Sequence, residues 1–423
     1  MLELIRENPK LVKESLKKRN LDPKAVDAII QLDEQWRKLK AEGDELRAKR
    51  NKLSLQINEL KKAGKDASKV IKEAAAIPER IKRLESEMKD HEQALHASWC
   101  SLPNILHESV PMGKDSSQNK VIKEFGKKPK FSFKPKNHVE LLEMNDLADF
   151  DRATKISGAR WFFLKNDLAV LGLALQRYAI DFMRARDYTF LIPPYFINRK
   201  SYEGVTSLDA FQDVLYKVEG EDLYAIATSE HPVTAAFADE VFLDKNLPLK
   251  MVAFSQCFRK EAGAHGIDQK GIFRVHQFDK VEQLIISPPE QSWKMHEELM
   301  NNAIDFWKTL EIPFRQVVLC SGDTGRVSAK TYDFDAWFPA SNEYREAGSC
   351  SNVTTWQSSR LNIKCETSPG TNRRLAHTLN STCVAIQRAL ATILENNQQA
   401  DGTIVVPKVL QKYTGFKVIG KKK

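Results

Sequence analysis

The apolar residues of the N-terminal quarter of the chain repeat in heptads. From residue 29 the two seam positions are filled by Ile29, Leu32, Trp36, Leu39, Leu46, Leu53, Ile57 and Leu60, with Gly43 and Arg50 as the exceptions. This spacing predicts one long amphipathic helix. The charged, glycine-containing segment 61–66 (KKAGKD) indicates a turn. A second seam follows the turn, made of Ile77, Ile81, Leu84, Met88, His91 and Leu95.

Two helices of similar length joined by a short turn must pack antiparallel. At 1.5 Å per residue, roughly 35 residues make an arm about 50 Å long. Such an arm is too long to fold back within one globule, so we expect it to project into solvent. Pro78 lies inside the second helix and removes one backbone hydrogen bond. We therefore expect a helix that is kinked near Ala74 and continues beyond the proline.

The pattern changes after the arm, which we expect to span residues 1–105. A lysine-rich stretch dotted with proline, 120–136, is typical of a linker, and we place that linker at 106–137. From residue 138 helical patterns (168–186, 292–310, 381–396) alternate with short β-rich runs (188–192, 223–226, 250–257, 281–286, 315–319). Their irregular spacing favours an α+β domain over 138–423, with an antiparallel sheet flanked by helices. No GxGxxG or P-loop motif occurs.

Composition narrows the class of protein only a little. The 423 residues, 42% hydrophobic and 29% charged, suit a soluble protein of two or three domains. The net charge of +9 weakly favours a polyanionic partner. The six cysteines lack ligand spacing, so we expect neither a disulfide framework nor zinc. We read no signal peptide and no membrane span, and expect a cytoplasmic protein.

The charge of the arm is concentrated toward its tip. Between residues 47 and 72 nine cations stand against two anions, a net charge of +7. The cations are Arg47, Lys49, Arg50, Lys52, Lys61, Lys62, Lys65, Lys69 and Lys72. A solvated coiled-coil surface is the alternative interpretation, because charge is normal there. The single sign favours contact with the phosphate backbone of a nucleic acid.

Two β-rich segments carry the candidate chemistry. Residues 254–261 (FSQCFRKE) and 271–278 (GIFRVHQF) are expected to form antiparallel strands joined by a polar loop. Alternation along the strands would group the side chains by face: Arg259 with Glu261, and Arg274 with His276 and Phe278. A guanidinium, a carboxylate and an aromatic ring on one sheet could hold the phosphate, amino group and ring of an adenine nucleotide. From this pattern alone, a surface ion-pair ladder is the preferred alternative.

Several motifs, in order and spacing, resemble those of the seryl-tRNA synthetases, a class II family. FRKE with FRVHQFDKVE is similar to motif 2, LIPPYFI ending at Ile197 to motif 1, and Thr228-Ser229-Glu230 to the family's T-[AS]-E serine motif. TYDFDAWFPASNEYREAGSCSN, HTLNST and ILENNQQADGTIVVP agree as well. The start, LIRENPKLVKESLKKR, and the close of the arm, SLPNILHESVP, also match, so the resemblance covers essentially the whole chain.

The resemblance implies activation of L-serine with ATP and Mg²⁺, followed by loading of tRNA(Ser), and of tRNA(Sec) as well. ATP would be bound by Arg259, Lys260, Glu261, Arg274, Val275, Phe278, Glu346, Ala347, Gly348, Ser349 and Arg388. Serine would be bound by Thr228, Ser229, Glu230, Arg259, Glu282, Asn380 and Thr382. The arm would recognise the long variable arm of the tRNA, and the motif 1 region would form a homodimer.

Individual roles follow from the same resemblance. Arg259 would hold the α-phosphate and the serine carboxylate, Glu261 the adenine amino group, and Phe278 the adenine ring. Arg274 and Arg388 would hold the outer phosphates, and Glu346 with Ser349 would bind Mg²⁺, a cation that prefers oxygen ligands. The serine ammonium would go to Thr228 and Glu230, and its hydroxyl to Glu282 and Thr382. The attacking carboxylate is already ionised, so alignment and charge neutralisation suffice without a general base.

The chain departs from the family pattern at a few positions. Residues 346–349 read EAGS where E-I-S-S is frequent, which removes one hydroxyl near ATP. Residues 357–360 read QSSR in place of Q-A-R-R, and Ser381-Thr382 replaces Gly-Ser. Two rivals remain at this point: a synthetase-like paralogue that loads a carrier protein, and a catalytically idle RNA-binding or regulatory protein. Pyrophosphate exchange and tRNA charging discriminate between them.

Overall fold

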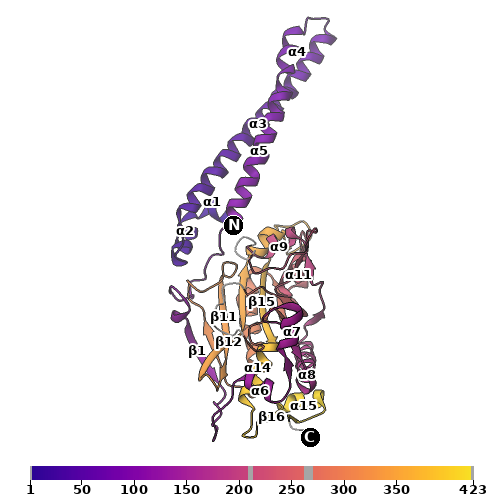
Figure 1. The fold of residues 1–423 in the computed structure, drawn as a ribbon. Helices are drawn as coiled ribbons and strands as arrows, with labels where there is room; N and C mark the ends of the chain where they lie inside the picture. Colours follow the sequence, from indigo (N-terminus) through magenta and orange to yellow (C-terminus); the bar gives the residue numbers. More distant parts are fainter. Residues whose placement is uncertain (1, 208–212, 262–269, 421–423) are drawn as a thin grey trace. The chain divides into compact units, whose positions relative to one another are not determined.

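The computed structural model describes residues 2–207, 213–261 and 270–420 of the chain (Figure 1). The chain divides into two units, Met1–Pro103 and Asn104–Lys423. In the described residues, no helix is long and apolar enough to cross a membrane.

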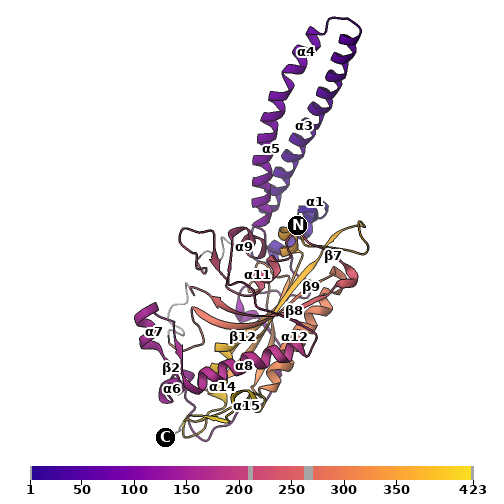
Figure 2. The ribbon, with the colours of Figure 1, turned by 90° about the vertical axis from the view of Figure 1, so that its right-hand side faces the viewer.

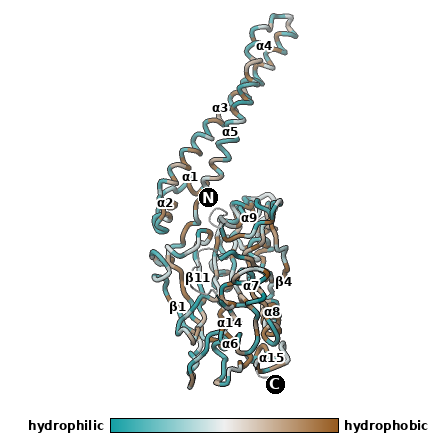
Figure 3. Tube along the Cα trace, viewed as in Figure 1, coloured by the Kyte–Doolittle hydropathy of each residue, from teal (hydrophilic) through white to brown (hydrophobic). Residues whose placement is uncertain are grey.

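The first unit consists of two short helices and a long helical hairpin. Its helices are α1 (Leu2–Glu7), α2 (Pro9–Lys18), α3 (Lys24–Lys62), α4 (Ser68–Ala75) and α5 (Ile77–Cys100). Helix α3 runs antiparallel to α4 and α5 (Figure 2). Hydrophobic residues recur among hydrophilic ones along both sides of this hairpin (Figure 3). Most of the buried ones are seam residues, among them Ile29, Leu53, Ile81, Leu84 and Leu95. The heptad prediction is therefore confirmed.

The prediction of one kinked helix around Pro78 is wrong, because two separate helices form there. Helix α4 ends at Ala75, and α5 begins at Ile77 with Pro78 in its first turn. The first turn of a helix has no partner for its backbone N–H groups, so a proline there loses no hydrogen bond. The chain accordingly restarts the helix instead of bending it.

The second unit is built on an eight-stranded sheet in the order β1-β10-β11-β12-β15-β9-β8-β4. All its neighbouring strands are antiparallel except β4 and β8, which are parallel. The strands are β1 (Lys120–Phe125), β4 (Thr189–Leu191), β8 (Leu249–Phe258), β9 (Gln277–Ser287), β10 (Phe314–Val318), β11 (Lys330–Phe338), β12 (Glu343–Thr354) and β15 (His377–Ala385). The predicted α+β architecture with an antiparallel sheet is confirmed.

Helices cover both faces of this sheet. Helices α8 (Asn166–Arg184), α12 (Ser292–Thr309) and α14 (Ile386–Asn396) pack on one face, where Val281 and Ile285 of β9 join the main core. Helices α9 (Arg199–Val205), α11 (Glu230–Ala235) and α13 (Trp356–Leu361) pack with Leu284 and Ile286, which point to the other face. This division follows from the alternation of side chains along a strand.

The remaining elements are short. The helices are α6 (His138–Met144), α7 (Phe150–Ser157) and α15 (Lys408–Thr414), with single turns at Ser116–Gln118, Asp244–Asn246 and Pro289–Gln291. The strands are β2 (Ala148–Asp149), β3 (Phe163–Leu164), β5 (Phe196–Ile197), β6 (Tyr224–Ala225), β7 (Val241–Leu243), β13 (Lys364–Glu366), β14 (Arg374–Leu375), β16 (Ile404–Val405) and β17 (Val418–Ile419).

Two expectations about secondary structure are corrected by the fold. Within the expected linker 106–137, residues Lys120–Phe125 form edge strand β1, which pairs with β10. The helix expected from Ser381 begins only at Ile386, because residues 381–385 end strand β15 and pair with β9. All five expected β-rich runs do contain a strand: β4, β6, β8, β9 and β10.

Candidate functional site

Polar side chains gather on the middle strands of the sheet, on the face opposite α8, α12 and α14. The register pairs Thr382 of β15 with Glu282 of β9, and Asn380 of β15 with Ser351 of β12. Thr382 donates a hydrogen bond to Glu282, with Oγ1 3.3 Å from Oε2. Side chains two residues apart on a strand share a face, so these groups lie side by side on the floor of one site.

A cavity of about 260 Å³ opens over this floor. It is lined by five of the seven predicted serine-binding residues: Thr228, Glu230, Arg259, Glu282 and Asn380. Thr382 lies next to it through its hydrogen bond to Glu282. Ser229 does not line it, because this side chain is fully buried in the protein. The structure thus brings six of the seven predicted serine residues together.

Lys280 is a residue of this cavity that the sequence interpretation did not single out. Its ammonium lies 2.5 Å from Oε2 of Glu282 and donates a hydrogen bond to Oγ1 of Thr228 at 2.7 Å. Both Lys280 and Glu282 are buried. One signal was available in the sequence: Phe278, Lys280 and Glu282 alternate along β9 and therefore share a face.

The carboxyl group of Glu230 is strongly perturbed by its surroundings in the cavity. Burial raises its pKa to about 7, and the neighbouring Glu282 carboxylate adds to the increase. Lys280, a hydrogen bond from Gln357 and Arg259 act in the opposite direction. A carboxylate that is buried and only partly compensated is a strong attractor for a cationic ligand group.

A second cavity, of about 90 Å³, adjoins the first over the same sheet. It contains ten of the eleven predicted ATP-binding residues: Arg259, Glu261, Arg274, Val275, Phe278, Glu346, Ala347, Gly348, Ser349 and Arg388. The eleventh, Lys260, is exposed, and its ammonium lies 5.7 Å from the ring centre of Tyr216 outside this cavity. Gln387 also lines the cavity and was not singled out from the sequence.

Arginine and glutamate side chains form pairs along the wall of the second cavity. Arg388 lies 3.1 Å from the Glu346 carboxylate and donates to its backbone oxygen at 3.0 Å. The charge of Arg388 holds the pKa of Glu346 below its usual range. Arg274 lies 3.8 Å from Glu261, and the Arg259 guanidinium stands 5.1 Å from the centre of the Phe278 ring. Arginine forks of this kind suit phosphate groups.

Three residues, Arg259, Lys280 and Ser349, line both cavities. A ligand that extended from one cavity to the other would therefore place its junction beside two cations and a hydroxyl. Within the described residues, no group of three or more His, Cys, Asp or Glu side chains is arranged to hold a metal ion. The half-exposed Glu346 carboxylate and the Ser349 hydroxyl are oxygen donors that fit Mg²⁺ bound jointly with phosphate oxygens.

The two strands of the expected motif are shorter than the alternation argument assumed. Strand β8 ends at Phe258 and β9 begins at Gln277, so Arg259, Glu261 and Arg274 lie outside the strands. One more backbone hydrogen bond, from Arg259 N to His276 O at 2.9 Å, extends the pairing. Glu261 adopts a left-handed conformation with φ of 50°. Residues 262–269 of the expected polar loop lie outside the described residues.

The cations expected near the tip of the arm lie on α3, the turn and α4. Arg47 pairs with Glu85 at 2.9 Å and with Asp44 at 3.2 Å, and Lys49 lies 2.6 Å from Glu73. In the described part of the arm, the other seven are exposed and make no ion pair: Arg50, Lys52, Lys61, Lys62, Lys65, Lys69 and Lys72. Their positive charge is therefore available to a partner.

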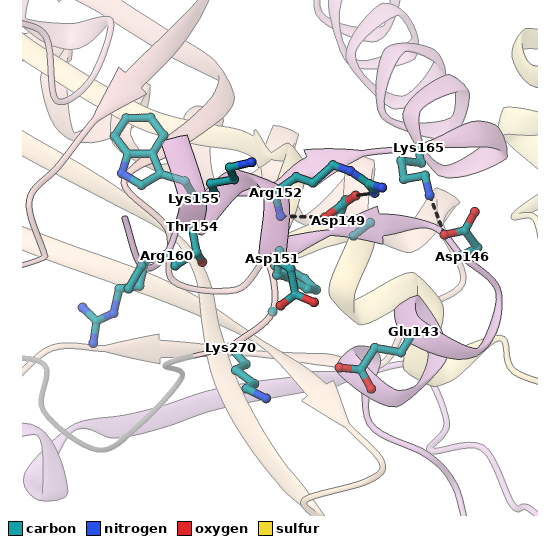
Figure 4. Close-up of a pocket in the computed structure, with 15 residues that line it drawn as sticks. Glu143, Asp146, Asp149, Asp151, Arg152, Thr154, Lys155, Arg160, Lys165 and Lys270 are labelled. Carbon is teal, nitrogen blue, oxygen red and sulfur yellow. Dashed lines mark hydrogen bonds and ion pairs between the residues drawn. The ribbon is translucent and has the colours of Figure 1, made fainter. Parts of the chain in front are cut away.

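A larger hollow of about 1000 Å³ lies in the second unit, and none of the predicted site residues lines it. Figure 4 shows its charged walls, in which Asp149 pairs with Arg152 and Asp146 with Lys165. Arg160 of the same hollow donates to the backbone oxygen of Glu261 at 3.1 Å. Volume alone does not identify a functional site. Convergent polar groups do, and they meet in the two smaller cavities.

Comparison with known proteins gives one consistent result. A family model for the seryl-tRNA synthetase N-terminal domain matches residues 2–106, and the tRNA synthetase class II core domain (G, H, P, S and T) matches residues 215–397. The serine–tRNA ligase of Methanospirillum hungatei is 51% identical over 419 residues, which cover 98% of this chain and 99% of that protein.

Two solved structures resemble the chain along its whole length. The seryl-tRNA synthetase of Pyrococcus horikoshii complexed with ATP has a TM-score of 0.95 and 45% identity, with 100% of each chain covered. The cytoplasmic serine–tRNA ligase of Naegleria fowleri in complex with AMP has a TM-score of 0.90 and 34% identity, covering 100% of this chain and 99% of the other. The chain belongs, along its whole length, to the seryl-tRNA synthetase family of class II aminoacyl-tRNA synthetases.

Proposed function

We propose that this chain is a serine–tRNA ligase: it activates L-serine with ATP and transfers the serine to the 3′ end of tRNA(Ser). The observation that carries the proposal is the pair of adjoining cavities with a shared lining of Arg259, Lys280 and Ser349. The reaction joins an amino acid to a nucleotide, and this lining is where the two would meet.

The larger of the two cavities suits serine. Glu230 and Thr228 receive the ammonium, and Glu282 with Thr382 receives the hydroxyl. A site built to hydrogen-bond a hydroxyl rejects an analogue that lacks it, because its own buried polar groups are then left without a partner. Arg259 holds the serine carboxylate at the boundary with the second cavity.

The smaller cavity suits ATP. Phe278 stacks on the adenine ring and Glu261 accepts from its amino group, while Arg274 and Arg388 hold the outer phosphates. Glu346 and Ser349 hold Mg²⁺, which neutralises phosphate charge when it is bound. In the first step a serine carboxylate oxygen bonds to the α-phosphorus. The bond from that phosphorus to the bridging oxygen breaks, and pyrophosphate leaves with the electron pair.

The chemistry needs alignment more than proton transfer. The attacking carboxylate carries its charge already, so the barrier comes from bringing two anions together and from charge that builds on phosphorus. Arg259 lowers both costs by holding the carboxylate and the α-phosphate at once. In the second step a ribose hydroxyl at the 3′ end of the tRNA attacks the seryl carbonyl carbon, and AMP leaves.

The proposal also covers how the chain binds its tRNA and how it assembles. Residues 1–105 form the tRNA-binding arm, 106–137 connect it, and 138–423 form the catalytic domain. The exposed cations of the arm bind the long variable arm of tRNA(Ser), and a tRNA(Sec) that shares this feature is charged with serine as well. The chain acts in the cytoplasm as a homodimer formed through its motif 1 region.

A pyrophosphate-exchange panel over all amino acids, followed by charging of purified tRNAs, tests the proposal. We expect exchange with serine far above any other amino acid, and serylation of tRNA(Ser). Exchange with serine but transfer only to a carrier protein would favour the paralogue alternative, for which the basic arm has no use. Absence of exchange would favour an idle RNA-binding protein, against which the retained Arg259, Glu261, Glu282, Glu346 and Arg388 speak.

A further inference from the structure

Behind the Glu230 carboxylate lies a buried amide that the proposed chemistry does not use. Gln357, in the first turn of α13, is 1% exposed, and its Nε2 donates to Oε1 of Glu230 at 2.7 Å. The same nitrogen donates to the backbone oxygen of Val205 at 3.1 Å, at the end of α9. One amide thus ties the carboxylate to the ends of two helices.

The orientation of this amide is fixed by its third partner. Thr378 of β15 donates from Oγ1 to Oε1 of Gln357 at 2.6 Å. The two N–H groups therefore point at Glu230 and at the Val205 oxygen. A flipped amide would place its oxygen against two acceptors, so the network selects a single orientation.

We propose that Gln357 is a positioning residue for amino-acid recognition, which aims the Glu230 carboxylate at the substrate ammonium. Thr378 acts through Gln357 by fixing the direction of its amide. This inference rests on the proposed activation of serine and adds a residue that does not touch the substrate.

The charges around Glu230 show why a neutral donor matters there. Glu282 faces it from β9 and opposes its ionisation, while Lys280 of β9 and Arg259 favour it. His231, the next residue on α11, is neutral, because burial lowers its pKa to about 3. Glu230 itself has a pKa near 7, with the hydrogen bond from Gln357 among the groups that lower it. Removing this donor raises the pKa further and leaves less carboxylate at neutral pH.

The test measures the pH dependence of serine-dependent pyrophosphate exchange between pH 6 and 9 for the wild type and for Gln357→Met. Methionine fills a similar volume without a donor. At pH 7 we expect the KM for serine to rise roughly 10-fold or more, since a hydrogen bond to a charged group is lost. The acid limb of kcat/KM for serine should move to higher pH by about one unit. The KM for ATP should stay within about twofold, because Gln357 does not line the ATP cavity.

Matched variants separate positioning from damage to the fold. Ser359→Ala alters α13 at a hydroxyl that donates to the nearby Trp356 backbone oxygen, and should keep the wild-type profile. Thr378→Val should shift the acid limb of kcat/KM in the same direction by a smaller amount. The double variant Gln357→Met with Thr378→Val should shift it no further than Gln357→Met alone. Thr378→Val also serves as the test if Gln357→Met does not fold.

The outcomes are distinguishable. A wild type without serine-dependent exchange would reject the proposed function itself. A working wild type whose Gln357→Met variant loses activity by a constant factor at every pH, with ATP and serine affected alike, would reject the positioning role and leave a structural one.

Discussion

The ammonium of Lys280 lies 2.5 Å from Oε2 of Glu282, and both side chains are buried on the same face of β9. Breaking such a pair leaves one buried charge without its partner, which costs about 3–5 kcal/mol. We therefore expect Lys280→Met to lower the thermal unfolding midpoint markedly.

The double variant Lys280→Met with Glu282→Leu shows whether the loss of stability comes from the unpaired charge of Glu282. Replacing both charges by apolar groups is expected to recover much of the lost stability, while serine activation stays low. Differential scanning calorimetry of the wild type, Lys280→Met and the double variant gives the comparison. If the double variant were less stable than Lys280→Met, Glu282 would be stabilised by other groups and not chiefly by Lys280.

Arg259 lines both cavities and is the group that we expect activation to need most. Arg259→Ala should reduce serine-dependent pyrophosphate exchange by about 10²-fold or more, since the lost contacts strengthen as charge builds on phosphorus. Arg152→Ala removes an exposed arginine of similar size that pairs with Asp149, and should leave exchange near normal. Near-normal exchange by a folded Arg259→Ala protein would overturn the assignment of this arginine.

Selection against alanine should come from the pair Thr382 and Glu282, which are joined by a hydrogen bond of 3.3 Å. Alanine would leave both groups without the substrate hydroxyl, so serine should be preferred by a factor of up to about 10⁴ in kcat/KM. Exchange kinetics with the two purified amino acids measure the ratio. Comparable activation of both by the wild type would mean that this cavity does not read a hydroxyl.

The raised pKa of Glu230, about 7, predicts the pH dependence of serine capture. As pH falls through 7 the carboxyl group takes up a proton and its attraction for the ammonium is lost. The kcat/KM for serine should therefore fall about tenfold per pH unit well below that value. The KM for ATP, measured at saturating serine, should change much less over the same range. A flat serine profile between pH 6 and 8 would mean that Glu230 stays ionised.

The sequence predicted best what depends on local periodicity. The heptad seam specified α3 and α5 because each apolar position repeats along one helix. Strand β1 was not predicted because five of its six residues are exposed, so its sequence shows no alternation of apolar and polar residues. Its pairing with β10 makes it a strand. The start of α14 was misplaced because a strand runs into a helix at Ala385 and Ile386 without a glycine or proline between them.

The candidate site shows the same limit. Motif resemblance found many of the residues that line the two cavities, though not Lys280 or Gln387, and the contacts between them are set by the fold. Lys280 meets Thr228 across 52 positions, and Gln357 meets Glu230 across 127. No spacing rule connects partners that far apart. Lys260 illustrates the converse, because it belongs to the motif in sequence and lies outside the cavity.

The last prediction concerns the cations of the arm. Seven exposed cations between residues 50 and 72, with no ion pairs in the described part of the arm, form a surface suited to a phosphate backbone. Deleting residues 47–72 and joining the helices by a short turn should preserve pyrophosphate exchange, because every residue that lines the two cavities belongs to the second unit.

Charging of tRNA(Ser) by the deletion variant should fall sharply, mainly through a raised KM for tRNA. The plot of log K against log salt for tRNA binding should also flatten, since each lost phosphate contact lowers the slope by roughly 0.7–0.9. A milder variant with Lys61, Lys62 and Lys65 changed to alanine keeps both helices and isolates charge from length. Its slope should drop by about 2–3 if all three lysines contact phosphates. If both variants charged tRNA like the wild type, the arm would be a spacer or a docking site for another protein, and its cations would be ordinary solvated groups.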